Sequence, residues 1–379
     1  MSIIIRDLSY VHSDKEILFQ HLNLIVNPGD KMALTGNNGC GKSTLMKIIA
    51  GDLSATRGTV SRPEHLYYVP QHFGQYDDQT IAQALRIDGK LEALHAILNG
   101  DVSEKHFTAL NDDWNIEERT QAALSAWGMD SIPLSRLMYG LSGGEKTRIF
   151  LAGMELHSPT AILLDEPTNH LDTAGRQRLY DLVQRTPAIV LVISHDRAFV
   201  DHITTRTIEV TMGRIYDYKV NYSSYLQLRQ ERRVQQQKAF DEQQKMIAET
   251  REFIERFKGT YSKTLQVQSR VKMLEKLEIL EVDEEDTSAL RLKFPPSPRS
   301  GTYPVIIENV AKTYGDHTVF RNANLMIERG DKIAFVGKNG EGKSTLVKCI
   351  MKEIEHDGTL TLGHNVQIGY FAQNQASLM

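Results

Sequence analysis

The chain has 379 residues, of which 41% are hydrophobic and 24% charged, and its formal net charge is −4. This length allows two or three domains with separate cores, and the composition excludes a chain that is disordered throughout. No apolar stretch reaches the roughly 18 residues of a membrane helix, the N-terminus lacks the layout of a secretory signal, and Cys40 and Cys349 have no metal-ligand spacing. These features predict a multidomain cytoplasmic protein without a stable membrane partner, and any nucleic-acid partner requires a local basic patch.

The first chemical signal is a glycine-rich loop at residues 36–43 with the sequence GNNGCGKS. It follows an apolar run at 31–35 that predicts a strand, and it precedes a periodic run at 44–50 that predicts a helix. Glycines let successive backbone N–H groups converge on a phosphate, Lys42 can reach the β- and γ-phosphates, and the Ser43 hydroxyl can ligate Mg²⁺. The predicted nucleotide-binding residues of this loop are Gly36, Asn37, Asn38, Gly39, Cys40, Gly41, Lys42, Ser43 and Thr44.

Three further apolar runs predict strands that end next to polar residues. The run ending before Gln71 places a side chain that could sense the metal or the attacking water. The run at 161–164 leads into Asp165 as a Mg²⁺ ligand and Glu166 as the group that orients or deprotonates water. The run at 188–194 leads into His195 as a γ-phosphate contact. Each of these residues, taken alone, is also compatible with an ordinary polar strand end.

A second glycine-containing loop, LSGGEK at 141–146, precedes a helix that we expect to begin near Glu145. It offers another set of backbone donors for a phosphate, which a single nucleotide site does not need. A head-to-tail pair of domains does need it, because each nucleotide then lies between the P-loop of one copy and the donor loop of the other. The residues of this signature loop are Leu141, Ser142, Gly143, Gly144 and Glu145. Between the motifs, 80–98 and 116–127 are predicted to be helical.

Residues 226–257 contain no Gly or Pro and carry apolar residues every seven positions, and a second helical stretch follows at 263–281. We expect an antiparallel helical hairpin whose longer helix, of about 36 residues, reaches roughly 54 Å. The apolar residues of the expected seam are Phe240, Ile247, Ile254, Phe257, Val267, Val271, Leu274 and Leu277.

The outer part of this hairpin is basic. Between Arg251 and Lys276 seven basic residues stand against three acidic ones. Such a surface suits phosphate contacts and base stacking, although a solvated helix face is the alternative interpretation. The predicted RNA-contacting residues are Arg251, Arg256, Lys258, Tyr261, Lys263 and Arg270.

The chain contains an internal repeat. Residues 330–350 repeat the sequence pattern of 29–49, and the offset is 301 residues for Lys42 and Lys343 and 302 for Gln71 and Gln373. Each copy also has an upstream tyrosine, Tyr10 or Tyr314, and a predicted strand that leads to its glutamine. We therefore predict a duplicated domain, with parts at 1–218, 219–302 and 303–379. The predicted nucleotide-binding residues of the second copy are Tyr314, Gly337, Lys338, Asn339, Gly340, Glu341, Gly342, Lys343, Ser344, Thr345 and Gln373, with Ser344 and Gln373 as Mg²⁺ ligands.

The order of Tyr10, GNNGCGKST, Gln71, LSGGEKTR, LLDEPTNHLD and SHDR resembles the ATP-binding-cassette superfamily over residues 1–218, and residues 303–379 resemble the opening of a second cassette. The resemblance implies an α/β fold of P-loop NTPase cassettes that bind ATP and Mg²⁺. Asn169-His170 and Glu145 resemble the soluble ABC-F family, whereas many transporter cassettes carry Ser-Ala and Gln at these positions. That family implies an ATPase that binds the ribosome, its ribosomal RNA and tRNA, and modulates translation through the hairpin.

Two alternatives stay open at this point. The first is an ABC-F protein that protects the ribosome from antibiotics, and the second is the ATPase subunit of a transporter, which the Asn169-His170 pair and the hairpin disfavour. The second copy has no donor loop, carboxylate pair or histidine after Gln373. We therefore expect a second cassette that is cut off, and a chain that binds ATP but turns it over slowly.

Overall fold

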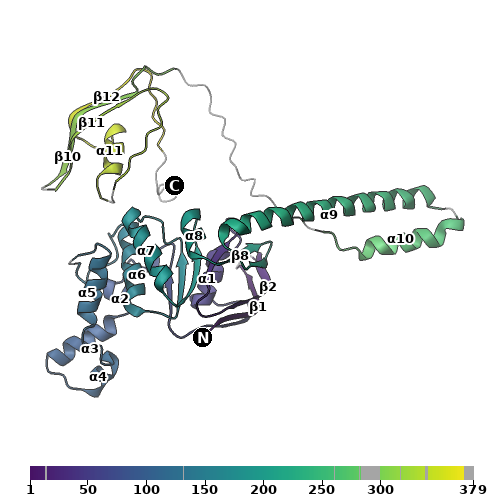
Figure 1. The fold of residues 1–379 in the computed structure, drawn as a ribbon, viewed down its shortest axis with the longest axis horizontal. Helices are drawn as coiled ribbons and strands as arrows, with labels where there is room; N and C mark the ends of the chain where they lie inside the picture. The colour runs from purple at the N-terminus through teal and green to yellow at the C-terminus, as the bar shows by residue number, and fades with distance from the viewer. Residues whose placement is uncertain are drawn as a thin grey trace. The chain divides into compact units, whose positions relative to one another are not determined.

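The computed structural model describes residues 1–12, 15–130, 132–259, 261–280, 282, 299–315, 317–337 and 340–370. The chain divides into two compact units, Met1–Leu171 with Gly175–Ser288, and Ala289–Met379 with Asp172–Ala174. Lys338, Asn339 and Gln373, which are candidates of the second copy, lie outside the described residues. Figure 1 shows the elements of both units.

The first unit is built on a six-stranded sheet of order β5-β6-β7-β3-β8-β9. Its strands are β3 (Lys31–Thr35), β5 (Leu66–Val69), β6 (Ala161–Asp165), β7 (Ile189–Ile193), β8 (Arg206–Thr211) and β9 (Arg214–Tyr218), and only β9 runs antiparallel to its neighbour. Every residue of β6 and β7 is buried. Ile162 belongs to one hydrophobic cluster and Leu163 to the other, so the sheet is covered on both faces. Continuous apolar runs are typical of strands in this position, and the three strands predicted before Gln71, Glu166 and His195 are confirmed.

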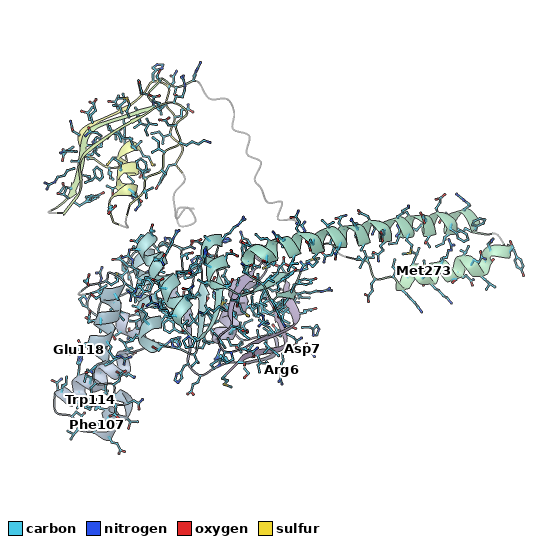
Figure 2. All side chains as sticks on the ribbon, viewed as in Figure 1. Arg6, Asp7, Phe107, Trp114, Glu118 and Met273 are labelled. Atoms are coloured by element: carbon cyan, nitrogen blue, oxygen red, sulfur yellow. The ribbon has the colours of Figure 1, made fainter. Side chains whose placement is uncertain are left out.

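Helices cover this sheet, and further helices form a subdomain that Figure 1 shows beside it. The helices of the sheet are α1 (Lys42–Ala50), α6 (Gly143–His157), α7 (Thr173–Arg185) and α8 (Arg197–Ile203). The subdomain contains η1 (Gly74–Tyr76), α2 (Ile81–Ala84), α3 (Asp88–Leu98), α4 (Glu104–Leu110) and α5 (Ile116–Ala126). The predicted helical stretch 80–98 is present as α2 and α3, and the left-handed φ of 58° at Arg86 interrupts it between them. The pattern also gave no sign of α4, whose Phe107 packs against Trp114 in a T-shaped arrangement with 6.2 Å between the ring centres (Figure 2).

The predicted hairpin is present. Its elements are α9 (Tyr222–Phe257), η2 (Tyr261–Lys263) and α10 (Thr264–Lys276), and α10 lies beside the outer part of α9 (Figure 1). In the expected seam Ile247 is buried, and the others are half-buried except Val271, which is 36% exposed. The shorter helix ends at Lys276 rather than at 281, because the chain then turns back onto α9. There, the Gln243 amide donates to the Glu278 carbonyl at 2.8 Å and accepts from the Leu280 amide at 2.9 Å. No helix among the described residues is long and apolar enough to cross a bilayer.

The second unit repeats the small antiparallel sheet of the first. The first unit has β1 (Ile3–Val11), β2 (Ile17–Val26) and β4 (Arg57–Ser61) in the order β2-β1-β4, and the second has β10 (Val305–Tyr314), β11 (His317–Ile327) and β12 (Asp357–Leu362) in the order β11-β10-β12, with α11 at Lys343–Ile350. Even the irregularities recur. Asp7 and Asn309 have φ of 49° and 50°, and a Cβ on Gly58 or Gly358 would lie 2.4 or 2.3 Å from the carbonyl oxygen of Asp7 or Asn309. The small antiparallel sheet of the second unit therefore repeats the backbone of its counterpart in the first.

Two strands expected in the second copy are absent from its described residues. Residues 331–337 and 366–370 form no strand, although their counterparts in the first unit are β3 and the run containing β5. In the first unit β3 lies between β7 and β8, and β5 pairs with β6. The described residues of the second unit contain no counterparts of β6, β7 or β8, so these segments lack the neighbours that complete a strand.

Candidate nucleotide-binding site

Three neighbouring parallel strands bring the predicted residues of the first copy together. Asp165 ends β6 opposite Ile193 of β7, and β7 pairs in turn with β3, which leads into the P-loop. Ligands of open α/β sheets bind at this carboxyl edge. A cleft of about 320 Å³ lies there, and the predicted residues that line it are Asn38, Gly39, Gly41, Lys42, Ser43, Thr44, Gln71, Asp165, Glu166 and His195.

The P-loop connects β3 to α1 and needs glycine at two tightly packed positions. Gly36 has a φ of 145°, and a Cβ there would lie 2.2 Å from the Val210 carbonyl oxygen. Gly41 has a φ of 96°, and its Cβ would lie 2.6 Å from Leu18 Cδ2. The Lys42 ammonium donates to the carbonyl oxygens of Gly36 and Asn37, both at 2.9 Å. No side chain caps the N-terminus of α1, so its first N–H groups remain for an anion.

Asp165 is 1% exposed and lies next to Ser43. Its Oδ2 accepts a hydrogen bond from the Tyr68 hydroxyl at 3.3 Å. Its Oδ1 is buried and has no hydrogen-bond partner within the part of the chain that the structure describes. Burial raises the pKa of the Asp165 carboxyl above its ordinary value, and the neighbouring Ser43 and Tyr68 hydroxyls oppose this effect. A buried carboxylate oxygen beside a serine hydroxyl offers the hard oxygen ligands that Mg²⁺ prefers.

Glu166 and His195 form a pair at the same edge of the sheet. Glu166 is 5% exposed and has a left-handed φ of 51°, and its amide donates to the Ile193 carbonyl at 2.8 Å. The His195 amide donates to Glu166 Oε2 at 3.2 Å, and His195 Nε2 lies 3.6 Å from Oε1. Burial raises the pKa of the Glu166 carboxyl. The His195 side chain is 75% exposed, so the pair joins a buried carboxylate to a group that a ligand can reach.

The signature loop is fully formed but does not line this cleft. Ser142 Oγ accepts from the Glu145 amide at 3.3 Å, and Glu145 Oε2 accepts from the Ser142 amide at 2.8 Å. This reciprocal capping box starts α6 at Gly143, two residues before the predicted Glu145. A Cβ on Gly143 would lie 3.4 Å from the His170 ring.

Some residues of the cleft were not predicted from the sequence. His12, Leu18 and Ile193 line it, whereas Tyr10 does not. Instead the Tyr10 ring packs edge-on against His12, with 5.3 Å between the ring centres. The repeat contained a signal for Leu18, because Val319 occupies the corresponding place 301 residues later, before the same phenylalanine.

The second P-loop repeats the geometry of the first at the glycine before its lysine, whereas Gly337 does not share the positive φ of its counterpart Gly36. Gly342 has a φ of 87°, and its Cβ would lie 2.4 Å from Val319 Cγ1, as that of Gly41 would clash with Leu18. The Lys343 ammonium donates to the Gly337 carbonyl oxygen at 2.7 Å. Gly340 has a φ of 91°, and Ser344 and Thr345 lie in the first turn of α11. Tyr314 is 52% exposed, and the Lys312 ammonium lies 4.9 Å from its ring centre.

The hairpin tip exposes most of the residues predicted to contact RNA. Tyr261 is 97% exposed, and Arg251, Arg256, Lys258 and Arg270 are also exposed, whereas Lys263 is half-buried. Two of these charges are paired within α9 or at its end, Arg256 with Glu252 at 2.5 Å and Lys258 with Glu255 at 3.7 Å. The Arg270 guanidinium lies 3.6 Å from the ring centre of Phe253.

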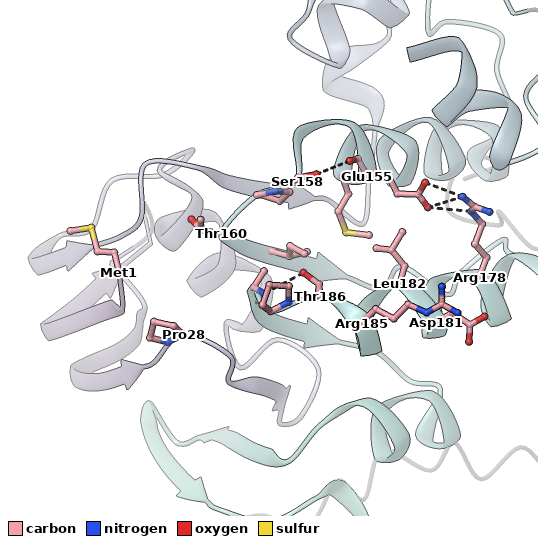
Figure 3. Close-up of a pocket in the computed structure, with 15 residues that line it drawn as sticks. Met1, Pro28, Glu155, Ser158, Thr160, Arg178, Asp181, Leu182, Arg185 and Thr186 are labelled. Carbon is pink, nitrogen blue, oxygen red and sulfur yellow. Dashed lines mark hydrogen bonds and ion pairs between the residues drawn. The ribbon is translucent and has the colours of Figure 1, made fainter. Parts of the chain in front are cut away.

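A larger pocket of about 730 Å³ lies at the opposite edge of the sheet, where β6 and β7 begin (Figure 3). Met154, Ile162 and Leu182 supply apolar lining, and Arg178 Nη2 contacts both carboxylate oxygens of Glu155, at 3.0 and 2.9 Å. None of the residues that line it belongs to a glycine-rich loop. The smaller cleft is therefore the candidate nucleotide site, because it contains P-loop residues and the two predicted carboxylates, which the larger pocket lacks.

Comparisons with known proteins agree with this geometry. A sequence model described as "ABC transporter" matches residues 19–169 and 320–377, and a second model with the same description matches 208–292. The matched segments include both P-loops, the carboxylates and the hairpin. The chain belongs to the ATP-binding-cassette family.

Curated relatives of this ABC protein come from bacteria and plants. It is 33% identical over 373 residues to "Probable ATP-binding protein YheS" of Escherichia coli strain K12, covering 95% of this chain and 58% of that protein. It is also 33% identical over 383 residues to "ABC transporter F family member 5" of Arabidopsis thaliana, covering 93% and 55%. The chain thus spans somewhat more than half the length of these relatives. A solved structure entitled "Structure of ATP binding subunit of ABC transporter" is 22% identical with a TM-score of 0.46, covering 58% of this chain and 90% of its own.

Proposed function

We propose that this ABC protein is a cytoplasmic ATPase of the ABC-F type that binds the ribosome and modulates translation through the hairpin of α9 and α10. The observation that carries the proposal is a long helical hairpin with an exposed basic tip, whose first helix begins a few residues after the last strand of an ATP-binding cassette. The similarity to a plant protein named as an F family member supports the type. We further propose residues 1–218 as the first cassette, 219–302 as the linker, and 303–379 as part of a second cassette.

Nucleotide binding in the first cassette would use the P-loop amides and Lys42. The Lys42 ammonium now donates to Gly36 and Asn37 carbonyls. It would turn to the β- and γ-phosphates, which are stronger acceptors because they are charged. The N-terminus of α1 would add the favourable field of its backbone amides. In the second cassette Lys343 would act in the same way.

The residues present fit Mg²⁺ as the cofactor. Ser43 and Asp165 would hold it together with Gln71, which lines the same cleft, and Ser344 is the corresponding hydroxyl of the second copy. The orphaned Oδ1 of Asp165 supports this assignment, because a buried carboxylate oxygen without a partner is costly. When bound, the cation neutralises charge on the phosphates.

Hydrolysis would depend on Glu166 and His195. Glu166 would orient the attacking water and accept its proton, and its raised pKa suits a general base. His195 would contact the γ-phosphate while its amide keeps the Glu166 carboxylate in place. The signature loop, Leu141–Glu145, would donate its amides to a nucleotide held by another cassette. Slow turnover by the 379-residue chain stays a prediction, which the steady-state rate of phosphate release measures.

The hairpin tip would contact ribosomal RNA or tRNA. Its exposed guanidinium and ammonium groups suit phosphates, and the almost fully exposed Tyr261 ring suits a base. The ion pairs with Glu252 and Glu255 are exposed and cost little to break, on the order of 0.2–1 kcal/mol each. They would exchange for phosphate contacts without a large penalty.

Co-sedimentation with ribosomes tests the proposal. The full chain carrying Glu166→Gln is centrifuged with purified ribosomes in ATP, in ADP and without nucleotide. We expect pelleting that depends on ATP, because blocked hydrolysis preserves the ATP-bound state. No pelleting in ATP from a chain that demonstrably binds ATP would overturn the ribosomal function. Recovery in the membrane fraction of a cell lysate would instead favour a transporter subunit, since the matching family is described as "ABC transporter".

A further inference from the structure

The base of the hairpin is held by a carboxylate that is completely buried. Glu209 lies on β8, and its side chain is 0% exposed. Arg229 Nε of α9 lies 2.6 Å from Glu209 Oε1, and Arg232 of α9 donates through Nη2 to Oε2 at 2.9 Å. The Arg232 guanidinium also lies 3.8 Å from the Tyr216 ring centre. One acid thus fixes two arginines from consecutive turns of the linker helix.

This carboxylate is also next to the P-loop. Glu209 pairs in register with Thr35, the residue that precedes Gly36. The following residue of β8, Val210, has the carbonyl oxygen that excludes a Cβ at Gly36. Burial raises the pKa of the Cys40 thiol inside the loop, and the charge of Glu209 contributes in the same direction. Glu209 therefore acts electrostatically on the loop as well as on α9.

A tyrosine of α9 links the two strands. Tyr225 is 1% exposed, and burial raises the pKa of its hydroxyl. Glu209 adds to this effect and Thr35 opposes it, so both residues lie close to the hydroxyl. The P-loop strand, the neighbouring strand and the first turns of α9 therefore share one buried polar network. Such a network is rigid only while each member keeps its partners, since an unpaired buried charge is costly.

The rest of α9 can transmit a movement of its first turns to the tip of the hairpin. It is continuous from Tyr222 to Phe257, 36 residues, and reaches the tip without a break. At 1.5 Å per residue its length is about 54 Å. A small rotation at the base is therefore enlarged at the tip.

We propose that Glu209 is a positioning residue that couples nucleotide occupancy of the first P-loop to the linker helix α9, through Tyr225 and the arginine pair. This inference rests on the proposed function, and it names the connection through which a nucleotide would act on the hairpin. Loop amides that close around a phosphate pull on Thr35 and Gly36, and the shared network transmits that shift to α9.

Amide hydrogen exchange of the full chain tests the coupling without ribosomes. We expect ATP with Mg²⁺ to slow exchange at residues 222–233 by at least about fivefold in the wild type, because amides exchange through local opening and the bound nucleotide would make this opening rarer. In Glu209→Gln, which keeps the shape of the side chain, this response disappears although ATP still binds. Glu155→Gln is the matched control, because it removes another acid paired with arginine, remote from the P-loop, and it should keep the response.

Tyr225→Phe separates coupling from simple anchoring. It keeps the buried ring and both Glu209–arginine contacts and loses only the hydroxyl. We expect α9 exchange without nucleotide to stay as in the wild type and the ATP response to fall. This variant still tests the coupling if Glu209→Gln fails to fold. An undiminished ATP response in either variant, or no response in a wild-type chain that binds ATP, overturns the inference alone. A wild-type chain that binds no ATP overturns the proposed function and this inference together.

Discussion

The backbone amide of His195 donates a hydrogen bond to Glu166 Oε2 at 3.2 Å, while Nε2 of the same histidine lies 3.6 Å from Oε1. One residue thus contacts both oxygens of a carboxylate that is almost fully buried. The amide contact does not depend on the protonation of the ring. The position of Glu166 is therefore fixed by the backbone, and the exposed imidazole remains available to a ligand.

This arrangement predicts separate effects on binding and turnover. Glu166→Gln should lower the rate of ATP hydrolysis by about 10²–10⁴-fold, the usual contribution of a general base. The affinity for ATP should change only severalfold, because the side-chain carbonyl oxygen of the variant still accepts the hydrogen bond from the His195 backbone amide. Phosphate release and equilibrium binding measure the two quantities. Glu155→Gln, at the opposite edge of the sheet, should change neither, and equal hydrolysis by Glu166→Gln and the wild type would remove Glu166 from the mechanism.

Lys42 should be essential for affinity. Its ammonium lies inside the P-loop, and removing one partner of a buried charged contact costs about 2–5 kcal/mol. Lys42→Ala should therefore weaken ATP binding by about 30-fold or more. Lys47→Ala changes an exposed lysine of the same helix and should leave affinity nearly unchanged. Equal affinities for the two variants would show that the nucleotide does not bind at this loop.

The glycines of the P-loop should differ from other glycines in their effect on stability. Gly29 and Gly36 both have positive φ, but only a Cβ at Gly36 would meet a backbone atom, the Val210 oxygen at 2.2 Å. Gly29→Ala should lower the free energy of unfolding by about 1–2 kcal/mol through backbone strain. Gly36→Ala should lose about 1–3 kcal/mol more through overpacking. Urea denaturation of both variants measures the difference, and equal losses would contradict the packing described here.

Asp165 should limit the stability of the nucleotide-free chain near neutral pH. Burial raises the pKa of its carboxyl, so the folded state still holds a proton at a pH where the unfolded chain has released it. The contribution of Asp165 to stability is therefore complete below about pH 4 and is lost as pH rises through the folded-state pKa.

Asp165→Asn removes this dependence on pH. At pH 8 it should stabilise the nucleotide-free chain by about 1 kcal/mol, or about 2–4 °C in Tm. The difference in the free energy of unfolding between Asp165→Asn and the wild type should become smaller as the pH falls toward 5. The same change should abolish the stabilisation that Mg²⁺ adds in the presence of ATP. A variant less stable than the wild type at pH 8 would show that the hydrogen bonds of Asp165 outweigh its burial.

The sequence predicted the elements whose signals are local. The runs at 161–165 and 189–193 are apolar throughout because both faces of β6 and β7 are covered, and their ends were right to within a residue. The small sheet of β1, β2 and β4 was not predicted. Its alternation fails at a bulge, where Asp7 adopts a φ of 49°. The break of the helix at Arg86 depends in the same way on a single backbone conformation.

In the candidate site, too, the residues with a local sequence signal were predicted, and those that depend on tertiary packing were not. The P-loop, the carboxylates and His195 were predicted because each follows a strand directly, and the structure brings them to one cleft. His12 and Leu18 were missed, because they reach the cleft only through the packing of β1 and β2 against the P-loop. Glu209 gave no signal either, since a lone acid in a strand shows its importance only when two arginines of a distant helix contact it.

The central claim is that the hairpin carries a nucleotide-dependent contact with the ribosome, and ribosome affinity of two charge-reversed proteins tests it most directly. In the Glu166→Gln background, one protein has Arg256, Lys258 and Lys263 changed to Glu, and the control has Arg6, Arg136 and Arg185, exposed residues of the cassette, changed to Glu. Binding in ATP is measured over a range of salt concentrations, because phosphate contacts weaken as salt rises. We predict that only the hairpin variant loses binding, by about tenfold or more, and that its salt dependence is shallower. Equal binding by the hairpin variant and its parent would contradict the account.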